Sequence, residues 1–76
     1  MPKLPVVKAR ELIRVLEKLG FYHYHQVGSH AQFKNSAGIK VTVAVHGGRE
    51  LGKKTVKGIL DDINISVEQF IEFLRK

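Results

Sequence analysis

The tripeptide Gly28-Ser29-His30 lies between two short runs predicted to be β-strands, and it is the first candidate for chemistry in this chain. Histidine changes its charge near neutral pH, so His30 could act as a general acid or base. Gly28 lets a backbone or a phosphate approach closely, and Ser29 offers a hydroxyl donor. At the mouth of a strand, the His30 imidazole can reach solvent or a ligand.

RNA is a substrate on which one positioned histidine can suffice. The 2′-hydroxyl is an internal nucleophile, so cleavage needs a base for its proton, an acid for the leaving oxygen and positive charge near the phosphorus. No metal is required for this reaction. One positioned histidine contributes about 10²–10⁴-fold, which is enough for a slow nuclease. The alternative, a turn histidine without a catalytic role, stays open at this point.

Three further histidines are candidates for other roles. His46 follows the third predicted strand in a second glycine turn, and it could be a second acid or base, a phosphate contact, or a strand-end residue bonded to a carbonyl. His23 and His25 are two residues apart in one strand, which predicts that both project from one face. That spacing is compatible with a metal pair, but no further ligands are implied. We therefore expect no metal and no other cofactor.

A basic cluster lies at or near the start of the second predicted helix. It consists of Arg49, Lys53, Lys54 and Lys57. The dipole at a helix N-terminus favours anions, so a phosphate backbone could rest against this cluster. A solvated helix face is the other interpretation. Two tyrosines in the first strand, Tyr22 and Tyr24, could stack on bases or serve only in strand packing.

The pattern of apolar residues predicts the elements that position these groups. Helical spacing indicates helices over 8–19, 53–63 and 67–75, and alternating or aromatic-rich runs indicate strands over 21–27, 30–35 and 40–45. Gly20 is expected to end the first helix, and Ser66 with Gln69 forms a predicted capping box for the third. Gly58 inside the second helix costs about 1 kcal/mol relative to alanine, and a packing contact with the sheet could explain it.

This order of elements predicts an α+β sandwich in which helices cover one face of a three-stranded sheet. Val41, Val43 and Val45 share one face of their strand, which should be the core face. The pattern does not decide which face of the first strand is buried. The other face of the sheet would remain available to a partner.

Composition limits the function classes. The chain has 76 residues and no cysteine, so we expect one domain over residues 1–76 in a reducing compartment. Its 13 basic and 7 acidic residues give a net charge of +6, which attracts polyanions such as nucleic acid. No apolar run is long enough to span a membrane, and residues 1–5 lack the apolar stretch of a signal peptide. These features predict a cytoplasmic protein.

Four segments together resemble a known family, the HicA toxins of bacterial and archaeal HicAB toxin–antitoxin systems. The segments are Arg10-Glu11-Leu12 through Gly20-Phe21, Gln26-Val27-Gly28-Ser29-His30, Val41 to Leu51, and Thr55 to Leu60. The resemblance extends from about Lys8 to Leu74. Its order and spacing are specific, although no single motif is decisive.

The resemblance implies a double-stranded-RNA-binding-like α-β-β-β-α fold, here with an extra C-terminal helix and an antiparallel sheet. It implies an mRNA interferase, an endoribonuclease that cleaves mRNA without a ribosome and without a metal, and a cognate HicB-type antitoxin that covers the active site. The catalytic histidine of the family's glycine-serine-histidine motif corresponds to His30, with Gly28 and Ser29 as its neighbours. The family's later histidine corresponds to His46. The free protein is expected to be a monomer.

Three positions depart from the family pattern. Ala44 stands where the family often has proline, Lys54 where a glycine often precedes the threonine of the second helix, and Gly58 where serine is commoner. These departures weaken the inferred substrate preference more than the inferred reaction. Two rival functions remain, a non-catalytic double-stranded-RNA-binding module and a protein-interaction subunit whose open sheet face only docks a partner.

Overall fold

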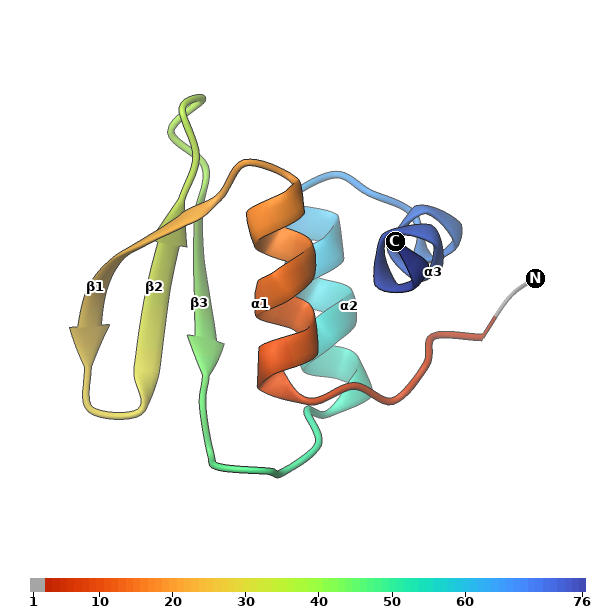
Figure 1. The fold of residues 1–76 in the computed structure, drawn as a ribbon, viewed down its shortest axis with the longest axis horizontal. Coiled ribbons are helices and arrows are strands. Elements are labelled where there is room, and N and C mark those ends of the chain that lie inside the picture. Colours follow the sequence, from red (N-terminus) through yellow and green to blue (C-terminus); the bar gives the residue numbers. More distant parts are fainter. Residues whose placement is uncertain (1–2) are drawn as a thin grey trace.

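The structure is a computed structural model that describes residues 3–76. This part of the chain forms three helices and a three-stranded sheet. Their order is α1 (Ala9–Lys18), β1 (Tyr22–Val27), β2 (His30–Lys34), β3 (Lys40–Ala44), α2 (Lys53–Asp62) and α3 (Val67–Arg75) (Figure 1). The predicted α+β class and element order are confirmed, with bounds that differ by a residue at several ends. Met1 and Pro2, which belong to the segment considered for a signal peptide, lie outside the described residues.

The helix ends follow the local sequence. The backbone N–H of Lys8 donates to Glu11 Oε1 at 2.9 Å at the start of α1, and Gly20, with φ of 93°, follows its end. At α3, the Gln69 N–H donates to Ser66 Oγ at 3.1 Å and the Ser66 N–H donates to Gln69 Oε1 at 2.8 Å. The predicted capping box is therefore present.

The three strands form an antiparallel sheet in the order β1-β2-β3. Between β2 and β3, Ala31 lies opposite Val43 and Phe33 opposite Val41, and all four side chains are buried. The valine face of β3 is therefore the core face, as predicted. Val45 follows the end of β3 and is half-buried against the same core.

A bulge in β1 changes which face its residues occupy. The pairing register shifts between His23 and His25, so His23 lies opposite the buried Phe33 while His25 lies opposite Gln32 on the other face. The prediction that His23 and His25 project from one face is wrong, because the bulge inserts Tyr24 as an extra residue and interrupts the alternation. The geometric basis for a metal pair at these two histidines is thereby removed.

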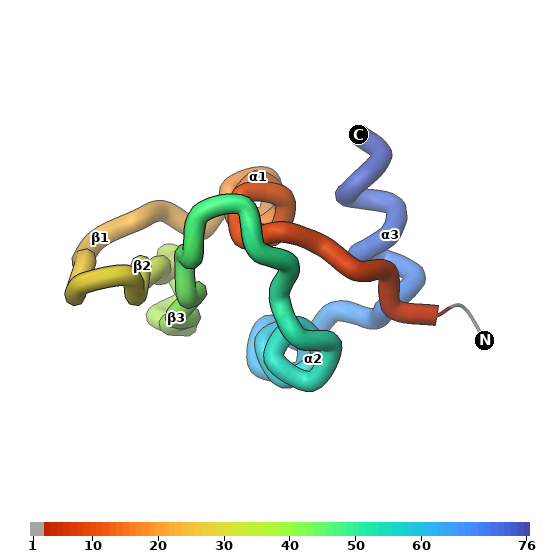
Figure 2. The backbone as a smooth tube through the Cα atoms, turned by 90° about the horizontal axis from the view of Figure 1, so that it is seen from below, coloured from red at the N-terminus to blue at the C-terminus, as the bar shows by residue number. Residues whose placement is uncertain are grey.

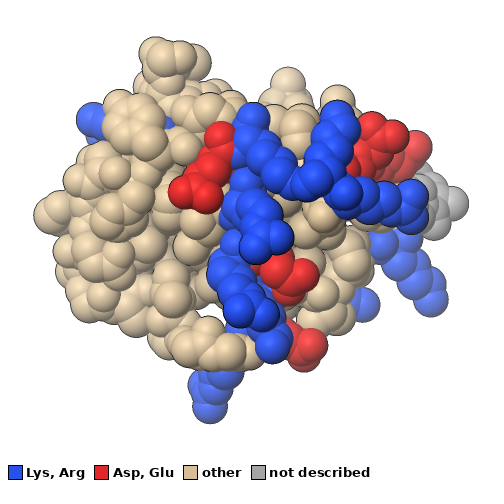
Figure 3. Space-filling model, in the orientation of Figure 1, with Lys and Arg blue, Asp and Glu red and all other residues tan. Residues whose placement is uncertain are grey.

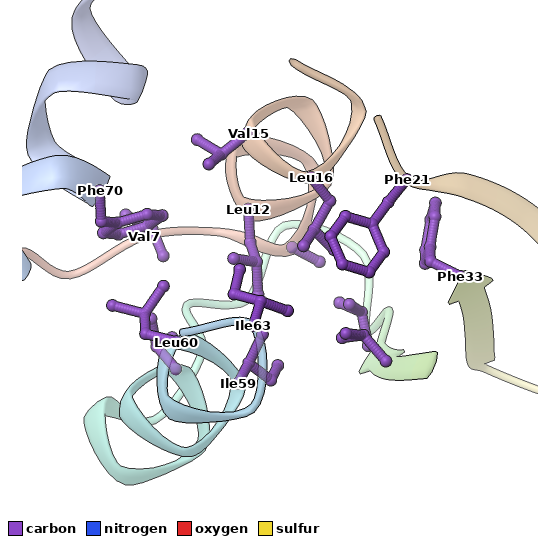
Figure 4. Packing of buried hydrophobic residues seen from close by; sticks show 14 of the residues in the cluster. Val7, Leu12, Val15, Leu16, Phe21, Phe33, Ile59, Leu60, Ile63 and Phe70 are labelled. Atoms are coloured by element: carbon purple, nitrogen blue, oxygen red, sulfur yellow. The ribbon is translucent and has the colours of Figure 1, made fainter. Parts of the chain in front are cut away.

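The core lies between the helices and the β2–β3 part of the sheet. Figure 2 shows α1 and α2 on the same side of β3, with α3 beyond them. Figure 4 shows side chains from α1, α2, α3 and the sheet pointing into one cluster, among them Leu12, Leu16, Phe33, Leu60 and Phe70. No residue of β1 is buried, and β1 lies farthest from the helices (Figure 1). The helices therefore cover only part of one sheet face.

Gly58 does not pack against the sheet. It is exposed on α2, and a Cβ atom added there would meet nothing within 4 Å. The predicted packing explanation is wrong, and nothing in the structure explains this glycine. Among residues 3–76, none of the helices combines the length and the apolar character needed to cross a lipid bilayer.

Candidate functional site

His30 is the first residue of β2 and its side chain is exposed. It lies opposite Val27 of β1 and opposite Ala44 of β3, so the position is fixed by ladders on both sides. The side chain projects from the sheet face that does not carry the buried Ala31, because adjacent residues of a strand alternate between faces. The sheet therefore presents an imidazole to solvent from the middle of its three strands.

The turn before His30 has a definite geometry. Gly28 has φ of 56°, and Ser29 is not among the residues with positive φ, which is the pattern of a two-residue type II′ hairpin turn. Glycine is the usual residue at that first position because it adopts positive φ without a steric cost. The Ser29 carbonyl accepts the Val45 N–H at 2.7 Å, which ties the turn to the chain after β3.

His46 lies at the same end of the sheet as His30. His30 pairs with Ala44, the last residue of β3, and His46 follows two residues later. Its side chain is exposed, and its carbonyl accepts the Arg49 N–H at 3.2 Å. The sequence left open whether the two histidines share one end or lie at opposite ends, and the antiparallel topology places them at one end.

No Asp or Glu occurs between Glu17 and Glu50, so the whole sheet and its turns carry no carboxylate side chain. All four histidines lie in this segment, together with Lys34 and Lys40. No carboxylate of the segment can orient the His30 ring, in contrast to the aspartate of a Ser-His-Asp triad. The same absence removes local repulsion against a phosphate, which suits a polyanionic ligand.

We call the sheet face on which His30 lies the open face. Its residues are Tyr22, Tyr24, His25, Val27, His30, Gln32, Lys34, Lys40, Thr42 and Ala44, assigned from the strand register and, for Tyr24, from its side-chain contacts. None of these side chains is buried. The face is therefore accessible along its whole length.

An aromatic and basic group occupies the middle of the open face. The Tyr24 hydroxyl donates to Gln32 Oε1 at 3.1 Å, and Lys34 Nζ lies 4.7 Å from the centre of the Tyr24 ring. The ring of His25 stacks beside Tyr24 at 6.4 Å between centroids. Gln32, Lys34 and Lys40 were not among the site residues predicted from the sequence, although all three lie in the acid-free segment between Glu17 and Glu50.

The predicted basic cluster belongs to the loop before α2 and to α2 itself. Arg49, Lys53, Lys54 and Lys57 are all exposed. Lys57 Nζ lies 2.5 Å from Asp61 Oδ1 one turn later, so its charge is partly neutralised on its own helix. Because α2 packs in the helix layer, these lysines are not on the open face with His30.

A second basic feature follows α1. Arg10, Arg14 and Lys18 are spaced four residues apart, which places them on one side of the helix. Figure 3 shows a band of Lys and Arg side chains along this face of the molecule. Lys18 also donates to the carbonyls of Phe73 and Lys76 at the end of α3. We call these three residues the α1 stripe.

Within residues 3–76 we find no pocket, and no three or more His, Cys, Asp or Glu side chains come together in a group that could hold a metal ion.

These features define the class of the protein: it is a small basic α+β domain with three helices and an accessible histidine at one end of an antiparallel sheet. A family model described as the HicA toxin of bacterial toxin–antitoxin systems matches residues 9–65, from the start of α1 to just beyond α2. The chain therefore belongs to the HicA toxin family, and the resemblance stated from the sequence is confirmed. No curated protein matches the chain at a significant level.

Membership in the HicA family defines the role of this chain within a toxin–antitoxin system. The chain is the toxin of a toxin–antitoxin pair, and such a toxin implies a cognate antitoxin as its partner. The matched region contains Gly28, Ser29, His30 and His46, together with the basic cluster at the start of α2. The family match therefore includes the whole glycine-serine-histidine motif and both histidines at this end of the sheet.

Proposed function

We propose that this toxin is a metal-independent endoribonuclease that cleaves mRNA, with His30 as the general acid or base. The observation that carries the proposal is the placement of His30: its imidazole is exposed, its backbone is paired with a strand on each side, and the sheet carries no carboxylate. Such a site attracts phosphates and supplies a group able to move a proton near neutral pH. Family membership supports the same reaction.

The reaction uses the RNA's own nucleophile. A base removes the 2′-hydroxyl proton, the 2′-oxygen bonds to the adjacent phosphorus, and the bond from phosphorus to the 5′-oxygen breaks. The products are a 2′,3′-cyclic phosphate and a 5′-hydroxyl, which receives a proton from an acid. His30 performs one of these two proton transfers. His46, at the same end of the sheet, is the candidate for the other.

Positive charge supports the transition state. Negative charge grows on the phosphoryl oxygens as the 2′-oxygen attacks, and nearby cations stabilise it. Arg49 follows His46 in the loop after β3 and is the cation of the basic cluster nearest in sequence to His46. Lys53, Lys54 and Lys57 lie on α2 in the helix layer, where they would hold phosphates farther along the RNA. Gly28 and Ser29 form the turn that positions His30. The toxin acts in the cytoplasm, where mRNA is translated, and a HicB-type antitoxin inhibits it by covering the site.

The test is cleavage of a labelled mRNA by purified protein in the presence of a chelator. The wild-type protein should produce fragments, and His30→Ala should abolish them while circular dichroism and the melting temperature stay unchanged. His46→Ala measures the contribution of the second histidine. An unchanged rate in His30→Ala would disprove the mechanism. Absence of any cleavage by the wild-type protein would disprove the nuclease.

A non-catalytic double-stranded-RNA-binding module is the second candidate, and the α1 stripe is the observation that favours it. A row of cations along a helix can contact successive phosphates of a duplex without reading its sequence. On this alternative, Arg10→Gln with Arg14→Gln should weaken duplex binding strongly, and no fragments should appear. Fragments that depend on His30 decide against the module.

A further inference from the structure

We infer that the open face is the surface on which this nuclease holds single-stranded RNA, with bases stacked on Tyr22 and His25, phosphates at Lys34 and Lys40, and a ribose at His30. The inference rests on the proposed function, and it places the substrate on the sheet instead of on the helices. It adds positions that are not in the glycine-serine-histidine motif or in the basic cluster of α2. Three separate features of the face support it.

The first feature is exposed apolar and aromatic area. Three large hydrophobic side chains are strongly exposed among residues 3–76, and two of them, Tyr22 at 51% and Val27 at 54%, lie on this face. Tyr22 stands in the row that contains Lys34 and Lys40, and Val27 stands opposite His30. Such rings and apolar side chains accept bases of any identity, because every base has a π-face.

The second feature is an aromatic pair on the same face, Tyr24 and His25, of which Tyr24 is held by side-chain contacts. Tyr24 is half-buried, and its hydroxyl bond to Gln32 and the Lys34 ammonium over its ring hold it in place. His25 stacks next to it and is itself exposed. The β1 bulge makes this arrangement possible, because it puts Tyr24 and His25 on the same face. A rigid ring costs less ordering entropy when a base stacks beside it.

The third feature is charge. The open face contains two lysines, two histidines and no carboxylate, so its charge complements a phosphate backbone. His30 and Lys34 are four residues apart in β2, which is about 13 Å along the strand. The four-stranded sheet of RNA-recognition domains stacks two or three bases on its aromatic side chains. The face therefore has room for a short single-stranded segment with His30 at one end.

Single-stranded RNA fits this face better than a duplex does. Stacking on the sheet requires bases that are free of their neighbours, and an A-form duplex keeps its bases stacked internally. The positive surface that could follow a duplex is the α1 stripe, which belongs to the helix layer. The two surfaces can be altered independently, so the experiment can separate them.

The experiment measures binding of a fluorescein-labelled, single-stranded 2′-O-methyl oligouridylate by anisotropy. The 2′-O-methyl group removes the internal nucleophile, so binding is measured without cleavage. Tyr22→Leu should bind about tenfold more weakly because it loses a stacking ring, whereas Tyr22→Phe should bind as the wild-type protein does. Tyr22 is exposed on an edge strand, so neither change should affect folding.

A matched pair of double variants tests the charges. Lys34→Gln with Lys40→Gln should reduce the slope of log K against log salt by about 1.4, as expected for two phosphate contacts to a single strand. Arg10→Gln with Arg14→Gln removes the same charge from the α1 stripe and should leave that slope unchanged. The reverse result would place the RNA on α1 and overturn the inference.

The native protein provides an independent readout. Tyr22 and Tyr24 are its only tyrosines and it has no tryptophan, so its intrinsic fluorescence comes from the open face. Saturable quenching by the oligouridylate is expected. If anisotropy shows that the oligouridylate binds but the tyrosine emission stays unchanged, the inference is overturned. A Tyr22→Leu variant that loses affinity for the cognate antitoxin but not for the oligouridylate would also overturn it.

The outcomes for this inference and for the nuclease are distinguishable. If the wild-type protein cleaves the unmodified oligouridylate while Tyr22→Leu binds and cleaves normally, the proposed binding surface is wrong and the nuclease stands. If binding depends on Tyr22 and Lys34 but the unmodified oligouridylate stays intact, the surface is supported and the nuclease is wrong.

Discussion

His30 lies directly opposite Ala44 in the antiparallel ladder between β2 and β3, and both side chains project from the open face. Directly opposed Cβ atoms in such a ladder are about 4.5–5.5 Å apart. Because Ala44 carries only a methyl group, β3 leaves one side of the His30 imidazole uncovered. Access to this ring therefore depends on a small residue at position 44.

On the proposed nuclease mechanism, enlarging residue 44 should block access to His30 without altering the chemistry of the imidazole. In Ala44→Leu, the longer side chain would occupy space beside the His30 ring, and we expect RNA cleavage to fall by about tenfold or more because the ribose is displaced. The same enlargement at Ala37→Leu, in the exposed turn between β2 and β3 and away from the His30 row, serves as the control. Single-turnover cleavage rates measure both. Equal rates in Ala44→Leu and the wild-type protein would show that this side of the ring is not used.

Gly28 and Gly58 allow a paired test of backbone conformation. A Cβ atom at either position would meet nothing within 4 Å, so neither substitution by alanine creates a clash. Gly28 has φ of 56° in the turn before His30, whereas Gly58 is inside α2. Gly58→Ala should stabilise the protein by about 1 kcal/mol and raise the melting temperature by about 4–8 °C. Gly28→Ala should destabilise it by about 1 kcal/mol or more.

Chemical denaturation of the two glycine variants measures these opposite signs. The midpoint should move up for Gly58→Ala and down for Gly28→Ala at an unchanged slope. Gly28→Ala should also slow RNA cleavage, because the altered turn displaces His30. A stabilising Gly28→Ala would contradict a positive φ at residue 28 and the type II′ turn that depends on it.

The ion pair on α2 gives a prediction about the basic cluster. Lys57 and Asp61 are both exposed, with side chains 54% and 62% accessible, so their contact contributes at most about 0.5 kcal/mol to stability. Asp61→Asn should therefore leave the melting temperature nearly unchanged. If Lys57 contacts RNA, the same variant should tighten RNA binding modestly at low salt, because a competing carboxylate is gone. Anisotropy with the oligouridylate, compared with Asp62→Asn on the same helix, checks this.

Much of the fold was predictable because the signals were local. The capping box at Ser66 and Gln69 and the glycine that ends α1 depend on residues a few positions apart, and each appears as predicted. The alternation of Val41 and Val43 in β3 likewise identified the core face. These elements follow from periodicity and capping chemistry alone.

The arrangement of the site was less predictable because it depends on pairing between strands. The β1 bulge moves His25 away from His23, and neither sequence spacing nor residue type reveals an inserted residue. The common end shared by His30 and His46 follows from the antiparallel register, which the sequence left open. The Gly28-Ser29-His30 motif could be identified from residue types alone. The residues that share the open face with His30 could be identified only from the strand register.

The position of Phe70 predicts that α3 is an integral part of the toxin. The family match ends at residue 65, before α3 begins, yet Phe70 is 0% exposed within the same core as Leu12 and Leu60. Lys18 of α1 also donates to the Phe73 carbonyl at 2.8 Å, which ties α1 to the end of α3. Phe70→Ala should therefore cost about 3–5 kcal/mol.

That cost is comparable with the whole stability of a domain of this size, about 0.05–0.15 kcal/mol per residue. We expect Phe70→Ala to be largely unfolded at 37 °C and inactive, whereas Glu72→Ala, an exposed change on the same helix, should retain the melting temperature and the cleavage rate. Urea titration followed by circular dichroism measures the difference. A fully stable Phe70→Ala would mean that α1, α2 and the sheet fold without α3, and that Phe70 is not part of the cooperative core.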